Sequence, residues 1–141
     1  MAFTAMPVPN FTPSSDALIA AATAATGNAY APYSNFRVGA AVLLEDGRTF
    51  SGCNVENISY GLTNCAERTA IFRAIAETPG GAIRIRALAV VNFAGLPCSP
   101  CGACRQVIAE FSSPDTTVFY RGANGFVAMP MKELLPESFH L

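Results

Sequence analysis

The sequence carries little charge and no concentrated positive patch. Only 13% of its 141 residues are charged, and its nine lysine and arginine residues form no cluster. Because proteins bind a nucleic-acid backbone with clustered basic side chains, no DNA or RNA polymer is expected as a partner. No apolar run reaches the roughly 20 residues that a transmembrane helix needs, so no membrane partner is expected either.

Histidine is almost absent, and the N-terminal segment has no charge. The single histidine, His140, lies one residue from the end and is expected to be a solvated tail residue, not a catalyst. Residues 1–13 have prolines at positions 7, 9 and 13 and are expected to form an irregular tail. They contain neither a positive region nor a long apolar core, so we expect no secretory leader and a cytoplasmic protein.

The apolar content is high for a chain of this size. Hydrophobic residues make up 51% of the sequence, and the mean hydropathy is +0.32. The length suits one domain, expected over residues 14–141. A small monomer would have difficulty hiding so much apolar surface from water, which favours an oligomer.

Segments whose apolar residues recur at helical spacing alternate along the chain with short apolar segments typical of strands. A helix is predicted from a cap at Ser14, Ser15 or Asp16 to Gly27–Asn28, and a hairpin turns at Asp46–Gly47. The other predicted elements are helices at 65–76, 101–111 and 131–135 and strands at 36–44, 49–53, 83–93, 116–120 and 126–129. Strands that alternate with helices predict an α/β fold, here a three-layer α/β/α sandwich around one mixed five-stranded sheet.

The cysteines indicate metal chemistry. There are five, and three form the run Cys98-x-x-Cys101-x-x-Cys104, which suggests a reducing compartment and not a disulfide framework. Cys65, followed two residues later by Glu67 and much later by Pro-Cys101-x-x-Cys104, is the signature of zinc deaminases.

Three of these cysteines suit a catalytic zinc ion. Such a site takes three ligands from the protein and keeps a fourth position for water, so Cys65, Cys101 and Cys104 are the predicted ligands of one Zn²⁺ per chain. Glu67 is the predicted proton shuttle for that water. If Cys65 and Cys101 each open a helix, the two helix dipoles favour the thiolate form.

Arg68 is a candidate for tuning the metal. Three thiolates on a dication leave a negative centre, which weakens the effect of the metal on bound water. A guanidinium that donates to a thiolate sulfur withdraws charge from the metal, and Arg68 directly follows Glu67. The alternative is an ordinary ion pair on the helix surface.

Two further cysteines have structural explanations. Cys98 with the other three thiols could close a tetrahedral structural site or begin an iron–sulfur run. However, Ile108 stands where a bacterial ferredoxin run places its fourth cysteine. Cys98 is therefore expected to pack as a small apolar side chain, and Cys53 to belong to core or loop packing.

Longer stretches extend the signature over nearly everything after the tail. They are Tyr30-Ala-Pro-Tyr-Ser34, Phe36-x-Val-Gly-Ala-Ala41, Gly52-Cys-Asn-Val-Glu-Asn57, Ser59-Tyr-Gly61, Cys65–Ala70, Ser99–Val107, and Glu133-Leu-Leu-Pro136 with Phe139. Together they make the chain resemble the small, homotetrameric, three-cysteine cytidine deaminases.

This resemblance implies a set of substrate contacts. Asn54 and Glu56 would hold the ribose 3′-hydroxyl, Phe36 would pack against the pyrimidine, and Ala66 would also contact the substrate. A carboxylate at the 3′-hydroxyl repels a 3′-phosphate, so free pyrimidine nucleosides are the expected substrates.

The resemblance also implies a homotetramer with shared sites, in which Tyr60 and Phe139 reach a neighbouring subunit's pocket. Ile58 departs from the family, because a small residue is common at this position. Backbone contacts at this loop tolerate such a change, whereas the larger side chain is expected to alter the fit against the neighbouring site.

The expected reaction is the hydrolytic deamination of cytidine and 2′-deoxycytidine, with release of ammonia, in pyrimidine salvage. Glu67 would carry protons from the activated water to the base nitrogen N3 and then to the leaving amino group. Two alternatives remain open at this point. One is a deaminase for another amino-heterocycle nucleoside, such as a blasticidin-type antibiotic, and the other is a non-catalytic zinc or iron–sulfur module.

Overall fold

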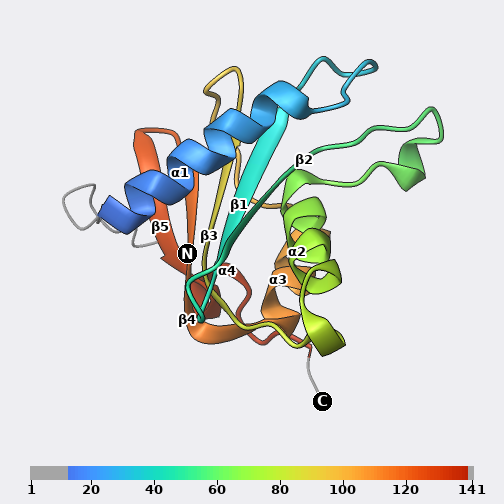
Figure 1. The fold of residues 1–141 in the computed structure, drawn as a ribbon. Helices are drawn as coiled ribbons and strands as arrows, with labels where there is room; N and C mark the ends of the chain where they lie inside the picture. The colour runs from blue at the N-terminus through green and yellow to red at the C-terminus, as the bar shows by residue number, and fades with distance from the viewer. Residues whose placement is uncertain (1–12, 140–141) are drawn as a thin grey trace.

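One mixed sheet organises residues 13–139, which are the residues that the computed structural model of this chain describes. Figure 1 shows the sheet between helices on its two faces. In chain order the elements are α1 (Pro13–Ala25), η2 (Thr26–Asn28), β1 (Val38–Leu44), β2 (Thr49–Cys53), η3 (Tyr60–Leu62), α2 (Ala66–Ala76), η4 (Pro79–Gly81), β3 (Ile85–Asn92), α3 (Gly102–Glu110), β4 (Ser112–Gly122), β5 (Gly125–Pro130) and α4 (Met131–Leu134).

The strand order in the sheet is β2-β1-β3-β4-β5. The β1–β2 hairpin turns where predicted, with Gly47 at a φ of 93°, a backbone conformation that suits glycine. β1 also pairs antiparallel with β3, and β5 pairs antiparallel with β4. β3 and β4 are parallel, with α3 as the crossover between them. The predicted mixed five-stranded sheet is confirmed.

Two apolar cores lie on opposite faces of the sheet, because successive strand residues point to opposite sides. On one face, Leu18 and Ala22 of α1 pack with Ala41 of β1 and Ala89 of β3. The other core is larger and takes buried residues from α2, α3 and α4. This arrangement confirms the predicted three layers (Figure 1).

Gly52 lets α2 lie directly on β2. A Cβ atom at this glycine would come 2.9 Å from Cα of Ala70, in the middle of α2. Real Cβ contacts are longer, so any side chain here would push the helix off the sheet. On the opposite face, Gly39 allows the segment after α1 to lie directly on β1, since a Cβ there would lie 2.8 Å from the backbone nitrogen of Thr26.

Some predicted boundaries move. The predicted cap at Ser14, Ser15 or Asp16 is wrong, because Pro13, the first described residue, already lies in α1. Proline suits a first helical turn, where its missing N–H leaves no bond unmade. β4 begins four residues before the predicted Thr116, with a register shift against β3 between Ile85 and Ala87.

The predicted tail, up to residue 12, and His140 lie outside the described residues. Among residues 13–139, none of the helices has the length and apolar character needed to cross a membrane.

Candidate active site

Two helix starts meet at the cysteines. Cys65 is the N-cap of α2 and Cys101 the N-cap of α3, both with extended backbone angles. The Cys104 amide in the first turn of α3 donates to Cys101 Sγ at 3.5 Å. The prediction that both cysteines open helices is confirmed, and each sulfur lies at the positive end of a helix dipole.

The three sulfur atoms of Cys65, Cys101 and Cys104 all lie within 4.8 Å of one another. The Cys65 and Cys101 sulfurs are 4.0 Å apart, which suits tetrahedral ligands at about 2.3 Å from one zinc ion. Cys104 is fully buried and Cys65 half-buried, whereas Cys101 is exposed. The donor set, three thiols with an open side, fits a zinc ion that keeps one position for another ligand.

The polar surroundings already favour one thiolate. The pKa of the Cys65 thiol is lowered to about 5, first by a hydrogen bond from Cys104 and then by the Arg68 guanidinium. The pKa of Cys104 is raised, because it supplies the proton in that bond and is buried. A metal ion in this position would replace the shared proton.

Glu67 lies in the first turn of α2 with only 4% of its surface exposed. Burial raises the pKa of its carboxyl from the usual 4.5 to about 7, and the charge of Cys65 adds to this effect. A carboxyl group with a pKa near neutrality can both accept and release a proton, so the position has the property that the predicted proton shuttle needs.

Arg68 turns toward the sulfur atoms and not to the helix surface. Its Nη2 donates to Cys65 Sγ at 3.3 Å. Among residues 13–139, no carboxylate lies within ion-pair distance of this guanidinium, and its Nε is buried without a hydrogen-bond partner. The alternative of a helix-surface ion pair is therefore wrong.

Cys98 does not complete a four-sulfur site. Within the described residues, the group of possible metal ligands contains the three predicted cysteines and not this one. Its half-buried sulfur lies 4.0 Å from the Ser99 carbonyl oxygen, and burial raises the pKa of its thiol. Cys53 is also half-buried, at the end of β2. Both positions agree with packing roles.

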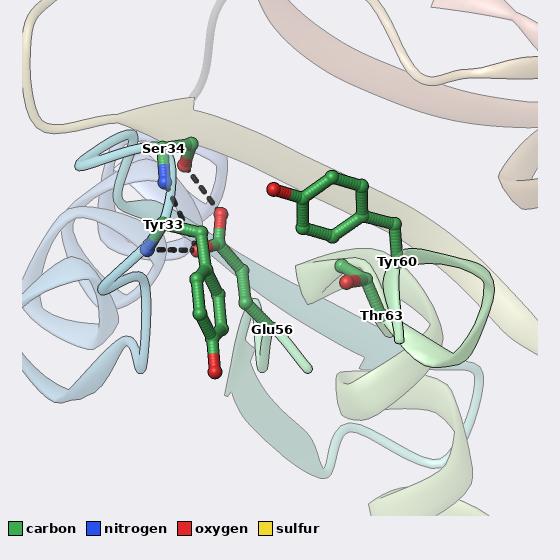
Figure 2. Close-up of a pocket in the computed structure, with 5 residues that line it drawn as sticks. All are labelled: Tyr33, Ser34, Glu56, Tyr60 and Thr63. Atoms are coloured by element: carbon green, nitrogen blue, oxygen red, sulfur yellow. Dashed lines mark hydrogen bonds between the residues drawn. The ribbon is translucent and has the colours of Figure 1, made fainter. Parts of the chain in front are cut away.

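A pocket of about 350 Å³ lies beside the loops that precede the metal motif. Figure 2 shows Tyr33, Ser34 and Glu56 on one side of it and Tyr60 and Thr63 on the other. The lining contains no cysteine, so this pocket is not the chemical centre of the site. The rings of Tyr33 and Tyr60 approach edge to face, with their centroids 6.2 Å apart.

Glu56 is anchored by the loop opposite it. Its carboxylate accepts hydrogen bonds from the Tyr33 amide at 2.9 Å, the Ser34 amide at 3.2 Å and the Ser34 hydroxyl. These bonds, the hydroxyl's above all, lower the pKa of Glu56. The group is therefore a fixed carboxylate with acceptor capacity left over, since its two oxygens offer about four acceptor sites.

Asn54 and Phe36 are held together. The buried Asn54 amide accepts from the Val38 N–H at 2.9 Å and donates to the Phe36 carbonyl at 2.8 Å. The Phe36 N–H donates to the Ser34 hydroxyl at 2.9 Å. One N–H of the Asn54 amide takes no part in these bonds, and the peptide units on both sides of Phe36 are fixed.

Backbone pairing joins this pocket to the metal motif. Val55 exchanges two hydrogen bonds of 2.9 Å with Asn64, the residue before Cys65, and forms a parallel bridge with Tyr30. The loops around residues 30 and 55 consequently extend together beyond the sheet, as Figure 1 shows.

The sequence assigned no role to Ser34, although this residue ties Glu56 to Phe36. Its place within the family-like stretch Tyr30–Ser34 is the one sequence feature that could have pointed to this role.

Ala66 is buried at the start of α2. The two predicted partners of a neighbouring pocket are exposed, Tyr60 by 76% and Phe139 by 73%, and Ile58 is exposed by 80%.

Known proteins share both the sequence and the fold. Residues 13–121 match the family model for the cytidine and deoxycytidylate deaminase zinc-binding region. This chain belongs to that family. A cytidine deaminase of Halalkalibacterium halodurans is 50% identical over 123 residues, which cover 86% of this chain and 91% of the relative. One from Mycobacterium tuberculosis is 46% identical over 125 residues, 85% of each chain.

Solved deaminase structures superimpose well on this one. The crystal structure of cytidine deaminase from Burkholderia pseudomallei has a TM-score of 0.78 and 50% identity, and the match covers 88% of this chain and 98% of that one. The enzyme from Mycobacterium tuberculosis has a TM-score of 0.77 and 42% identity, over 89% and 97% of the two chains. The family match and the cysteine geometry together give this deaminase a zinc cofactor.

Proposed function

We propose that this protein deaminates cytidine and 2′-deoxycytidine by hydrolysis, forming the uridine nucleosides and ammonia. The observation that carries the proposal is the buried Glu67, whose pKa is about 7, beside three thiols within 4.8 Å of one another. The family match over residues 13–121 supports the same reaction.

Zinc held by Cys65, Cys101 and Cys104 would supply a Lewis acid that makes water a nucleophile at neutral pH. Glu67 accepts the proton of that water and delivers it to N3 of the base, which makes C4 electrophilic. When the water oxygen has bonded to C4, Glu67 takes the second proton from that oxygen and carries it to the amino group, which leaves as ammonia as the C4–N bond breaks. Its burial keeps competing bulk water away from the proton that it moves.

A spectrophotometric assay tests the reaction. Cytidine absorbance should fall while ammonia appears in equal amount, and 3′-CMP should react poorly because Glu56 would repel its phosphate. A blasticidin-type nucleoside antibiotic serves as the alternative substrate. Preference for the antibiotic would assign the rival reaction, and a protein that binds zinc but deaminates neither would be a non-catalytic module.

Glu56→Ala should chiefly raise KM for cytidine. We propose that Asn54 and Glu56 bind the ribose 3′-hydroxyl, with Phe36 and Ala66 against the base. Glu56 lines the pocket of Figure 2, and three hydrogen bonds leave its carboxylate with acceptor capacity. A lost hydrogen bond to a charged group corresponds to an increase in KM of about 10-fold or more. KM for free cytosine, which lacks the sugar, should change little.

Ser34→Ala is the matched control for Glu56→Ala. It removes the hydroxyl that anchors Glu56 but leaves the carboxylate itself. Its KM should rise less than that of Glu56→Ala. If the two variants behave alike, Glu56 matters only for holding the loop of Tyr33 and Ser34.

Arg68→Gln should keep zinc and lose activity. We propose that the 3.3 Å contact between its guanidinium and Cys65 Sγ draws thiolate charge away from the metal. Partners of this kind typically change activity by about 10- to 100-fold. Zinc analysis and kcat are the measurements, and Arg73→Gln, which removes an exposed pair with Glu77 on the same helix, is the control. Equal kcat in both variants would contradict the role.

We further propose a homotetramer that works in the cytoplasm, in pyrimidine salvage. The exposed rings of Tyr60 and Phe139 and the exposed Ile58 support an assembly in which a neighbouring chain covers them. Thiol ligands must be reduced to bind zinc, which supports the reducing compartment. In such a tetramer, Tyr60 and Phe139 would complete another chain's pocket.

Mixed subunits test the shared site. A Glu67→Gln chain and a chain without residues 138–141, each nearly inactive alone, are unfolded and reassembled together. A buried Phe139 ring would contribute about 1.5–3 kcal/mol, so its deletion should cost at least about 10-fold. Activity should return in mixed tetramers, where an intact Glu67 pocket meets an intact tail. Without recovery in tetramers shown to be mixed, the tail does not serve a neighbouring site.

A further inference from the structure

Arg105 joins three segments of the chain around the metal motif. This half-buried side chain, in the first half of α3, donates from Nε to the Pro100 carbonyl at 2.8 Å and from Nη2 to the Ser99 hydroxyl at 3.1 Å. From Nη1 it donates to the Leu134 carbonyl at 2.9 Å. Each nitrogen of the guanidinium therefore holds a different acceptor.

Two of these acceptors directly precede the ligand Cys101. The backbone N–H of Arg105 also donates to the Cys101 carbonyl at 2.9 Å. Arg105 thus fixes the peptide units on both sides of Cys101, through its side chain before it and through its backbone after it. Cys101 is exposed, so its sulfur has little packing around it and accepts one hydrogen bond, from the Cys104 amide. The contacts of Arg105 fix the main chain that carries this sulfur.

The third acceptor lies in the last turn of α4. Leu134 is buried, and the final carbonyls of a helix have no partner within the helix. Arg105 supplies that partner. The neighbouring Gln106 donates from Nε2 to the Phe139 carbonyl at 3.3 Å. One turn of α3 thereby attaches the C-terminal segment to the loop that carries a metal ligand.

The contacts of Arg105 are not those of a surface charge. Among residues 13–139, it belongs to no ion pair. A planar guanidinium can reach three acceptors in fixed directions, whereas the single ammonium of lysine cannot reproduce this fork. The arrangement selects arginine for its shape.

We propose that Arg105 is a positioning residue that holds the Cys101 loop in its metal-binding geometry and attaches the C-terminal segment to it. This inference rests on the zinc site within the proposed function. Its test is the release of zinc, which does not depend on the identity of the substrate.

The experiment measures zinc release from the zinc-loaded protein to a chromophoric chelator. Arg105→Gln should release zinc about 10-fold faster or more, in the range by which supporting partners of metal ligands act. The rate of zinc release from Arg105→Lys should be close to that from Arg105→Gln, although lysine keeps the positive charge. Ser99→Ala, which removes one of the three bonds, should accelerate release less.

Two controls separate positioning from general stability. Arg84→Gln removes an arginine bond to the Ser112 carbonyl, far along the chain from the metal ligands, and should leave release unchanged. Ile108→Val loosens the buried face of α3 but keeps all three bonds of Arg105. If Ile108→Val accelerates release as much as an Arg105 variant with the same Tm, the proposal is overturned.

Wild-type release rates in both Arg105→Lys and Ser99→Ala would also overturn it. Should Arg105→Gln fail to fold, these two variants decide the question alone. A protein that holds zinc but does not deaminate cytidine would disprove the proposed reaction and leave this inference intact.

Discussion

Glu67→Gln is expected to keep its fold and its zinc while losing nearly all turnover. Glutamine has almost the same shape and can occupy the same buried position, but it cannot take up or release a proton at neutral pH. Loss of a general acid–base group typically costs about 10²- to 10⁴-fold, and two proton transfers here depend on the same carboxyl. Zinc analysis and single-turnover kinetics with cytidine are the measurements.

The control for this variant is Glu77→Gln, at the other end of the helix, whose carboxylate makes an exposed pair with Arg73. It should retain the wild-type rate. A Glu67→Gln protein that keeps zinc and most of its activity would contradict the proposed mechanism.

The same variant should change how stability responds to pH. In the metal-free protein, burial raises the pKa of Glu67 from 4.5 to about 7. The folded state then holds its proton more tightly than the unfolded state, so stability falls as pH rises from 4.5 through 7. Glutamine does not titrate. Relative to Glu67→Gln, the metal-free wild type should lose up to roughly 3 kcal/mol across this window, measured by urea unfolding.

Cys101→Ala should lose both zinc and activity. Two remaining thiolates hold a catalytic zinc ion weakly, and the exposed side chain of Cys101 can be removed without leaving a buried cavity. The protein should therefore remain folded, and metal analysis after dialysis should find little zinc. Activity should fall with the zinc content.

Cys98→Ala is the matched control in the same run of cysteines. Its sulfur is not part of the ligand group, so this variant should keep zinc and activity. If Cys101→Ala retains full zinc and Cys98→Ala loses it, the ligand set would have to be redrawn around Cys98.

Local chemistry made much of this fold predictable. The Asp46–Gly47 turn and the apolar strands around it predict the hairpin. Helix formers that directly follow Cys65 predict the start of α2. The start of β4 was not predictable, because Ser113 and Pro114 read as a loop. The structure accommodates them in an irregular strand beginning, where proline is tolerated.

The site, too, has a part that the sequence predicts and a part that it does not. Sequence spacing singles out Cys65, Glu67 and the later cysteines, because zinc requires particular donor atoms and the reaction requires a carboxylate beside them. The contacts of Ser34 with the Glu56 carboxylate and of Arg105 with the Leu134 carbonyl could not be predicted, since each pair is far apart in the sequence and is brought close only by the folded chain. Backbone acceptors have no residue type and leave no pattern in a sequence.

The missing side chain of Gly52 has a consequence for catalysis. Since α2 rests on the backbone of β2 with nothing between them, the first turn of the helix has little freedom to tilt or slide. Cys65 and Glu67 therefore occupy their positions before any substrate arrives. When the charged groups are already in place, their reorganisation during each turnover costs little free energy. Variation in rate among relatives of this protein should then follow the loops around residues 33 and 60, which line the pocket, more closely than the helix that carries Glu67.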